Sequence, residues 1–231
     1  MKLSSQMNRA EETKSCEFCR ELLNDPSSRF RRLYYPQLES RIVARRYGFV
    51  VLPTLGQLFK GSLLVLPESH FETFSSLPQL MVDRLPDLVT ELESSTQQFG
   101  LPLIFEHGAR CHTGAGCGIY HAHLHLVPLP ESVHHSVILP GTSRIAANIS
   151  EALRSLRSSS LYLLVRDTHG NTAFLEPSPA TAMSFPSQYV RRRLVDHFKL
   201  RTPWDWRDYT GAEPWLLETV QLLETHVSFS S

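Results

Sequence analysis

The sequence predicts an α+β fold, in which short strands and helices share one compact unit. Residues 121–126 alternate between histidine and apolar side chains, which is the two-residue period of a strand with one buried face. Residues 62–67 form a short apolar run that ends at a proline, as a buried strand does. Residues 77–98 carry apolar side chains every three or four positions, which is the period of a helix.

The remaining elements follow from the same periods and from turn residues. In chain order we expect strands over residues 39–45, 47–53, 101–105, 161–165 and 172–175, and helices over residues 143–156, 186–198 and 215–223. Pro86 should kink the helix of residues 77–98 or begin a new first turn in it. Ser143 is expected to cap the helix that follows it.

Composition narrows the class of protein. The chain has 231 residues, and its 23 Lys and Arg residues balance its 23 Asp and Glu residues, so nothing favours a nucleic-acid partner. No apolar run approaches the roughly 18 residues of a membrane span, and the N-terminus lacks the apolar segment of a secretory signal. Four cysteines do not make a disulfide scaffold at this length, so we expect a cytoplasmic protein.

The three alternating histidines are the strongest chemical signal. On a regular strand His121, His123 and His125 share one face, while the residues between them face the core. Three interpretations compete: a polar strand face without a role, a metal site, and covalent catalysis by one imidazole. The preceding glycine-rich segment, residues 114–118, offers backbone N–H groups to an anion, which points to chemistry on a phosphate or another oxyanion.

Two cysteines near the N-terminus form a second signal. Cys16 and Cys19 have the spacing with which two thiolates bind one Zn²⁺, but a closed site needs two further ligands. Cys111 and Cys117 are the other cysteines of the chain. A redox pair or a coincidence explains the spacing of Cys16 and Cys19 equally well.

The histidine segment resembles the signature of the histidine triad superfamily of nucleotide hydrolases and transferases. The matching residues are His121–Val127 in their alternation, preceded by Gly116 and Gly118. The resemblance implies a histidine-triad-like antiparallel sheet with flanking helices and a C-terminal α/β extension. It divides the chain into a frayed N-terminus at residues 1–13, a catalytic domain at residues 14–130, and an extension at residues 131–231 that packs on the same unit.

The run from Gly61 to His70 is similar to a second feature of the superfamily, in which a glycine, an apolar strand and a proline precede a histidine. In the zinc-bearing branch this histidine completes a structural zinc site. The resemblance therefore implies a zinc ion held by Cys16, Cys19, His70 and His121.

The resemblance also implies a mechanism. His123 would attack the α-phosphorus of a nucleotide while its Nδ1–H donates to the backbone carbonyl of His121. His125 would bind the transferring phosphate and assist the leaving group. Backbone amides near Gly116, Cys117 and Gly118 would stabilise the phosphoryl oxygens. His107 and His112 are expected in the loop that flanks this glycine-rich segment. Solvation is the ordinary interpretation of loop histidines, and action on the leaving group is the alternative that their position offers.

The implied activity is hydrolysis of a nucleotide phosphoanhydride or phosphoramidate through a nucleotidyl-histidine intermediate. Transferases of the galactose-1-phosphate uridylyltransferase type carry glutamine where this chain has His125, which favours hydrolysis. A nucleotidyltransferase and a zinc-stabilised binding protein without turnover remain the alternatives. The expected partners are a small-molecule nucleotide and a second copy of the chain in a homodimer.

The extension carries two further features. Residues 204–207 resemble a tail seen in some extended bacterial members of the superfamily. Residues 191–193 are three consecutive arginines. The ordinary interpretation of such a run is a solvated face, and the more specific interpretation is that one arginine contacts a polyphosphate.

Overall fold

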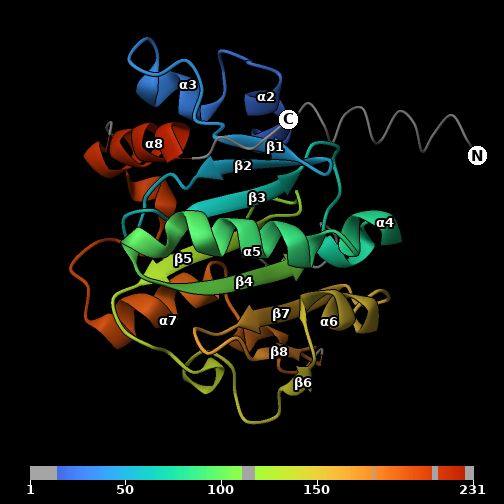
Figure 1. The fold of residues 1–231 in the computed structure, drawn as a ribbon. Helices are drawn as coiled ribbons and strands as arrows, with labels where there is room; N and C mark the ends of the chain where they lie inside the picture. The colour runs from blue at the N-terminus through green and yellow to red at the C-terminus, as the bar shows by residue number, and fades with distance from the viewer. Residues whose placement is uncertain (1–14, 111–117, 179, 210–212, 227–231) are drawn as a thin grey trace, which may run out of the picture.

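One antiparallel sheet forms the centre of the molecule (Figure 1). The computed structural model describes residues 15–110, 118–178, 180–209 and 213–226. The sheet has eight strands in the order β1-β2-β3-β5-β4-β7-β8-β6, and every neighbouring pair is antiparallel. Their bounds are β1 Ala44–Arg46, β2 Phe49–Pro53, β3 Leu63–Pro67, β4 Leu101–Ala109, β5 Leu124–Leu129, β6 Arg144–Ala146, β7 Leu161–Arg166 and β8 Thr172–Leu175. The predicted α+β class with an antiparallel sheet and flanking helices is confirmed.

The helices cover both faces of this sheet. Helices α5 (Leu85–Thr96) and α6 (Ile149–Ser155) pack on one face, where Leu88 and Leu153 join a large apolar cluster with alternate residues of the strands. The opposite face is covered by α2 (Glu17–Leu22) and α7 (Tyr189–Phe198). Helices α3 (Arg29–Tyr34) and α8 (Pro214–His226) pack on each other at the β2 end of the molecule, and α4 (Gln79–Val82) precedes α5.

Alternate side chains of the strands point to opposite faces of the sheet, as the sequence pattern predicts. In the segment that contains the three histidines, Ala122, Leu124 and Leu126 join the cluster beneath α5 and α6. His123 and His125 therefore lie on the other face, toward α2 and α7. Strand β5 begins only at Leu124, so His125 lies within the sheet and the two earlier histidines lie in the segment that enters it.

Three of the elements predicted from the sequence have different bounds in the structure. The helix of residues 77–98 is divided, because Pro86 lies in the first turn of α5 and begins a new helix after α4. The predicted strand over residues 39–45 is reduced to β1. The predicted helix over residues 143–156 starts later, because Asn148 rather than Ser143 caps α6, accepting a 2.9 Å hydrogen bond from the Glu151 amide, while the preceding residues form β6.

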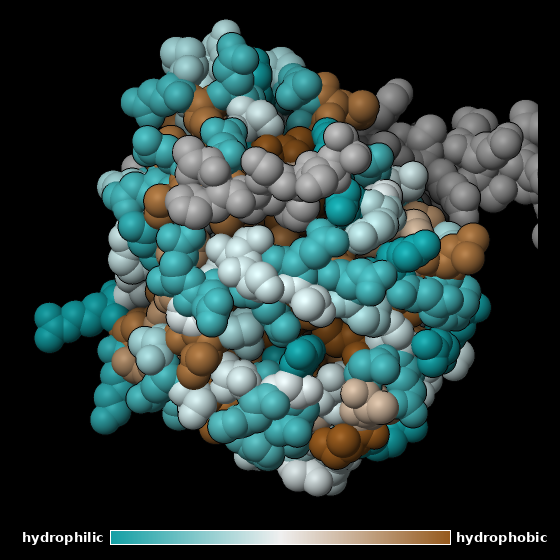
Figure 2. Space-filling view, viewed as in Figure 1, coloured by the Kyte–Doolittle hydropathy of each residue, from teal (hydrophilic) through white to brown (hydrophobic). Residues whose placement is uncertain are grey.

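The surface over α5 is mostly hydrophilic, with hydrophobic side chains dispersed among polar ones (Figure 2). The most exposed large apolar residues lie on separate elements, as Leu23, Leu80 and Met183 show. In the ranges that the structure describes, no helix combines the length and the apolar character needed to cross a bilayer.

Candidate active site and metal site

The three histidines of the motif are buried side by side beneath α2 and α7. His121 is 0%, His123 6% and His125 8% exposed. The rings of His123 and His125 lie 5.2 Å apart between centroids, and Phe18 of α2 contacts the rings of both His121 and His123 edge-on. On the side of β4, the ring of Phe105 stacks on His125 at 4.4 Å.

One hydrogen bond determines the tautomer of His123. Its Nδ1 lies 2.6 Å from the backbone carbonyl oxygen of His121. A carbonyl oxygen only accepts, so Nδ1 carries the proton and Nε2 carries the lone pair. Burial lowers the pKa of His123 below its ordinary value of 6.5, so the imidazole is neutral at pH 7. His123 thus has the protonation state of a nucleophile.

A small cavity of about 50 Å³ lies at these rings. His123, His125 and His107 line it from the sheet, and apolar side chains such as Phe18 and Phe105 surround them. The opposite wall comes from residues far along the chain, namely Gln188, Val190, Arg191 and Trp206. The C-terminal extension therefore builds one wall of the triad cavity.

The expected loop position of His107 is wrong, and His112 lies outside the described residues. Strand β4 continues to Ala109 and pairs with β7, so His107 is a strand residue directed into the cavity. Burial, and after it the nearby His123, lowers the pKa of His107 to about 4. His107 is therefore a neutral wall of the cavity at pH 7.

Its neighbour Glu106 faces the other side of the sheet. The Glu106 carboxyl accepts hydrogen bonds from the Phe74 amide at 2.9 Å and from the Tyr162 hydroxyl. Complete burial raises the pKa of Glu106 to about 7, against the effect of these hydrogen bonds. The hydrogen bond between Tyr162 and Glu106 anchors β4 next to the cavity. No sequence pattern predicts it, because the two residues are distant in sequence.

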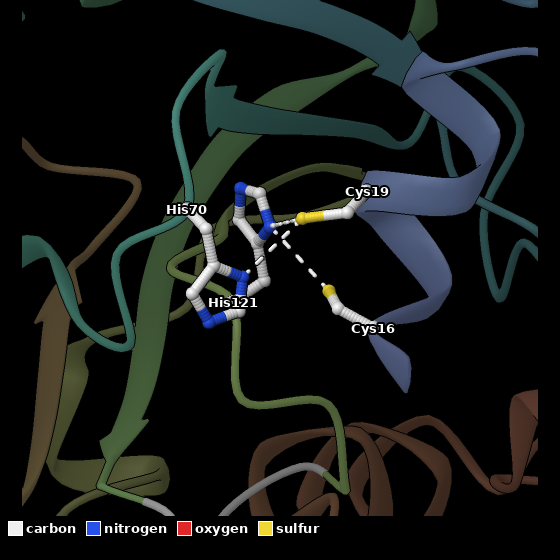
Figure 3. A group of neighbouring side chains, drawn as sticks. All are labelled: Cys16, Cys19, His70 and His121. Carbon is white, nitrogen blue, oxygen red and sulfur yellow. Dashed lines mark hydrogen bonds between the residues drawn. The ribbon is translucent and has the colours of Figure 1, made fainter. Parts of the chain in front are cut away.

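Four side chains predicted to bind zinc meet on the outer side of the triad (Figure 3). The Sγ atoms of Cys16 and Cys19 lie 3.5 and 3.4 Å from Nδ1 of His121, and Cys19 Sγ lies 3.3 Å from Nδ1 of His70. All four ligand atoms lie within 4.8 Å of one another. A tetrahedral Zn²⁺ with ordinary bond lengths separates sulfur and nitrogen ligands by about 3.6 Å.

The orientation of His121 also fits a metal ligand. Its Nε2 lies 3.0 Å from the backbone carbonyl oxygen of Pro67, so Nε2 carries the proton and the lone pair of Nδ1 is directed at the two sulfur atoms. Hydrogen bonds from Cys19 and from the two imidazoles hold the pKa of the Cys16 thiol well below its ordinary value. The donor set and its spacing therefore fit a tetrahedral zinc ion.

The predicted anion-binding amides lie elsewhere or outside the described residues. Gly118 is exposed with φ of 82°, and it lines an open groove of about 370 Å³ next to the metal-ligand cluster rather than the triad cavity. Gly116 and Cys117 lie outside the described residues. The groove and the cavity adjoin, because Glu17, Ile119 and Trp206 line both.

Two buried arginines line the cavity that were not among the site residues predicted from the sequence. Arg41 follows no motif, and only the fold brings it to the cavity. Arg191 belongs to the arginine run of residues 191–193, for which a solvated face was the ordinary expectation and contact with a polyphosphate the alternative. The structure divides that run, because Arg191 is buried, Arg192 is half-buried and Arg193 is exposed.

Comparisons with known proteins give structural matches alone. No family model matches the chain, and no curated protein does. Among solved structures, the chain is similar to a zinc-bound histidine triad family protein from Mycobacterium smegmatis, with 18% identity, a TM-score of 0.38, and coverage of 63% of this chain and 93% of that one. It is also similar to a Hit-like protein from Bartonella henselae, with 13% identity, a TM-score of 0.39, and coverage of 52% and 79%.

A third match is a hypothetical histidine triad nucleotide-binding protein from Sulfolobus tokodaii, with 24% identity and a TM-score of 0.33. It covers 41% of this chain and 64% of that one. The chain is similar to each of these structures over part of its length. Its resemblance to the histidine triad superfamily rests on the alternating histidines of the sequence.

Proposed function

We propose that the chain hydrolyses a nucleotide phosphoanhydride or phosphoramidate through a covalent intermediate on His123. The observation that carries this proposal is the hydrogen bond from His123 Nδ1 to the carbonyl oxygen of His121, which leaves the lone pair on Nε2. A neutral imidazole is nucleophilic, and in a buried cavity little water has to leave it before it attacks. The small-molecule substrate is a nucleotide, as the resemblance implies.

The reaction takes two displacements at one phosphorus atom. The Nε2 lone pair forms an N–P bond to the α-phosphorus, and the bond from phosphorus to the leaving group breaks with its electron pair going to that group. A water oxygen then attacks the same phosphorus, and the N–P electron pair returns to Nε2. The proton that the water loses passes to solvent or to a neighbouring base, so the second displacement releases a nucleoside monophosphate.

The neighbouring side chains take supporting roles in this proposal. His125, stacked on Phe105 beside the nucleophile, donates to the transferred phosphate or to the leaving group. His107 lines the same cavity and contacts the substrate near the leaving group. Gly116, Cys117 and Gly118 supply backbone amides to the phosphoryl oxygens.

Cys16, Cys19, His70 and His121 would hold a structural zinc ion. Bound there, the metal supplies rigidity rather than chemistry on the substrate. It would fix the backbone of His121, whose carbonyl orients the nucleophile two residues later. The metal ligands and the nucleophile are thus adjacent in sequence but separate in role.

The test is to trap the intermediate. The protein is incubated with diadenosine tetraphosphate or adenosine 5′-phosphoramidate, quenched in base, and weighed by mass spectrometry. A mass increase of one adenylyl group on the peptide that contains His123 supports the proposal. The variant His123→Ala should give no adduct, while His134→Ala, which removes a half-exposed imidazole from another loop, should retain it.

Two outcomes separate the alternatives. An adduct that is released only when a second nucleotide or sugar phosphate is added indicates a nucleotidyltransferase. Binding of the nucleotide without any adduct or product indicates a binding protein, and it contradicts the hydrolase. A homodimer, which the resemblance implies, is checked by sedimentation of the same sample.

A further inference from the structure

Two buried arginines face the triad cavity, and they differ in how their charge is neutralised. Arg41 is 1% exposed and forms a bidentate ion pair with Glu21, with both N–O distances at 2.7 Å. Arg191 is 6% exposed, and its Nε and Nη2 atoms donate to two backbone carbonyl oxygens, those of Trp204 at 2.7 Å and Gly56 at 2.8 Å. Within the described part of the chain, Arg191 has no ion pair with a carboxylate at 4.0 Å or less.

A buried cation of this kind is costly unless an anion meets it. Burial lowers the pKa of Arg191 to about 10, so the guanidinium is still charged at pH 7. The carboxylates of Asp205 and Glu213 lie near enough to favour the charged form of Arg191, but neither forms an ion pair with it. Asp205 accepts from Arg207 at 2.7 Å and from Gln188 at 2.8 Å, and Glu213 accepts from the Gln57 amide at 3.4 Å. Carbonyl oxygens therefore position Arg191 without cancelling its charge.

The position of this charge is next to the third histidine of the motif. Arg191 and His125 line the main cavity together, and they also line a smaller cavity behind it with Thr54 and Ser62. Burial, followed by the effects of His123 and Arg191, holds the pKa of His125 well below its ordinary value. His125 and His107 are therefore neutral, and Arg191 brings to the cavity a positive charge that no carboxylate of the described residues pairs with at 4.0 Å or less.

We propose that Arg191 binds a second phosphate of the substrate, so that the substrate is a phosphoanhydride rather than a phosphoramidate. The proposal rests on the proposed function. In the proposed function the transferred phosphate has His125 as its contact in the cavity. The amine that leaves a phosphoramidate brings no anion for Arg191, whereas the phosphate that leaves a phosphoanhydride does. A guanidinium matches phosphate oxygens in geometry as well as in charge.

The experiment compares two substrates that share one nucleoside, diadenosine tetraphosphate and adenosine 5′-phosphoramidate. The variant Arg191→Gln should lower kcat/KM for diadenosine tetraphosphate by about 10- to 100-fold, because it removes a charged hydrogen bond to phosphate. It should change kcat/KM for the phosphoramidate by less than about threefold. An equal loss on both substrates, or no loss on either, would overturn the proposal.

A matched control lies two residues away on the same helix. Arg193 is exposed and donates to the carbonyl oxygen of Val137 at 2.8 Å, away from the cavity wall. Arg193→Gln removes the same charge from α7 and should leave both substrates unchanged. If Arg191→Gln does not fold, as its melting temperature will show, Arg191→Lys replaces it. The lysine keeps the charge but lacks the planar fork, so it should still lose activity selectively on the polyphosphate.

A binding measurement separates this proposal from the proposed function. Titration calorimetry with inorganic pyrophosphate needs no turnover. The wild-type protein and Arg193→Gln should bind it with equal affinity, and Arg191→Gln should bind it at least tenfold more weakly. If the wild-type protein turns over neither nucleotide but shows this difference, the hydrolase is wrong and the anion site stands. Equal pyrophosphate affinity in the wild-type protein and Arg191→Gln overturns the anion site.

Discussion

The backbone carbonyl oxygen of His121 accepts a 2.6 Å hydrogen bond from Nδ1 of His123. His121 thereby joins two sites, because its side chain faces Cys16 and Cys19 while its carbonyl orients the next histidine. Side chain and backbone of one residue serve different neighbours. Substitutions at the two histidines should therefore have different consequences.

We expect His123→Ala to abolish hydrolysis while bound zinc persists, since the His123 side chain does not belong to the four-residue ligand cluster. His121→Ala should lower the zinc content and the melting temperature together, because one of four ligands is lost. Zinc is measured by atomic absorption and hydrolysis by product chromatography. Loss of metal in His123→Ala with retention in His121→Ala would reverse the assignment of roles.

Glu106 makes stability depend on pH. Its pKa rises from the ordinary 4.5 to about 7 because it is buried, so the folded state retains a proton that the unfolded state releases above pH 4.5. This contribution to the free energy of unfolding is complete below pH 4.5 and is lost as the pH rises through 7. The loss is about 3 kcal/mol at 1.36 kcal/mol per pKa unit.

The measurement is urea unfolding of wild-type protein and Glu106→Gln between pH 4.5 and 8. Glutamine does not titrate, so the stability of the wild-type protein relative to the variant should fall across this range. A difference that stays constant with pH would show that Glu106 ionises normally. Any constant offset reports the altered hydrogen bonds to Phe74 and Tyr162.

Breaking the buried ion pair of Arg41 and Glu21 should lower the free energy of unfolding far more than breaking an exposed ion pair. Glu21→Gln leaves Arg41, 1% exposed, without its anion, and we expect a loss of about 3–5 kcal/mol in the free energy of unfolding. Glu68→Gln breaks the pair with Arg45, whose side chains are 46% and 52% exposed, and should cost less than about 1 kcal/mol. Equal effects in chemical denaturation would contradict the distinction.

Gly108 should resist substitution for reasons of space. A Cβ atom at Gly108 would lie 2.3 Å from Cζ of Tyr162, whose ring is buried and whose hydroxyl bonds to Glu106. We expect Gly108→Ala to lower the free energy of unfolding by about 1–3 kcal/mol through overpacking. At Gly141 nothing lies within 4 Å of such an atom, so Gly141→Ala should leave the urea midpoint nearly unchanged. Similar urea midpoints for the two variants would contradict this prediction.

The period of the side chains by itself determined which face of each element is buried. The alternation from His121 to Val127 separates the imidazoles from the core, and the apolar stripe of residues 77–98 yields α5 with Pro86 in its first turn. The spacing of Cys16 and Cys19, read with the family resemblance, also anticipated the cluster with His70 and His121. These features depend on residues that are close in sequence or that belong to a recognised motif. They can therefore be predicted from the sequence without the structure.

Only the tertiary structure decided what completes the cavity. Strand β4 runs past Phe105 because it pairs with β7, which carries His107 out of a loop and into the cavity wall. Arg191 and Arg193 belong to one run of arginines by sequence, yet packing of α7 on the sheet buries Arg191 beside His125 and leaves Arg193 in solvent. Pairing partners distant along the chain set both outcomes, because strand register and helix docking depend on the whole core rather than on neighbouring residues.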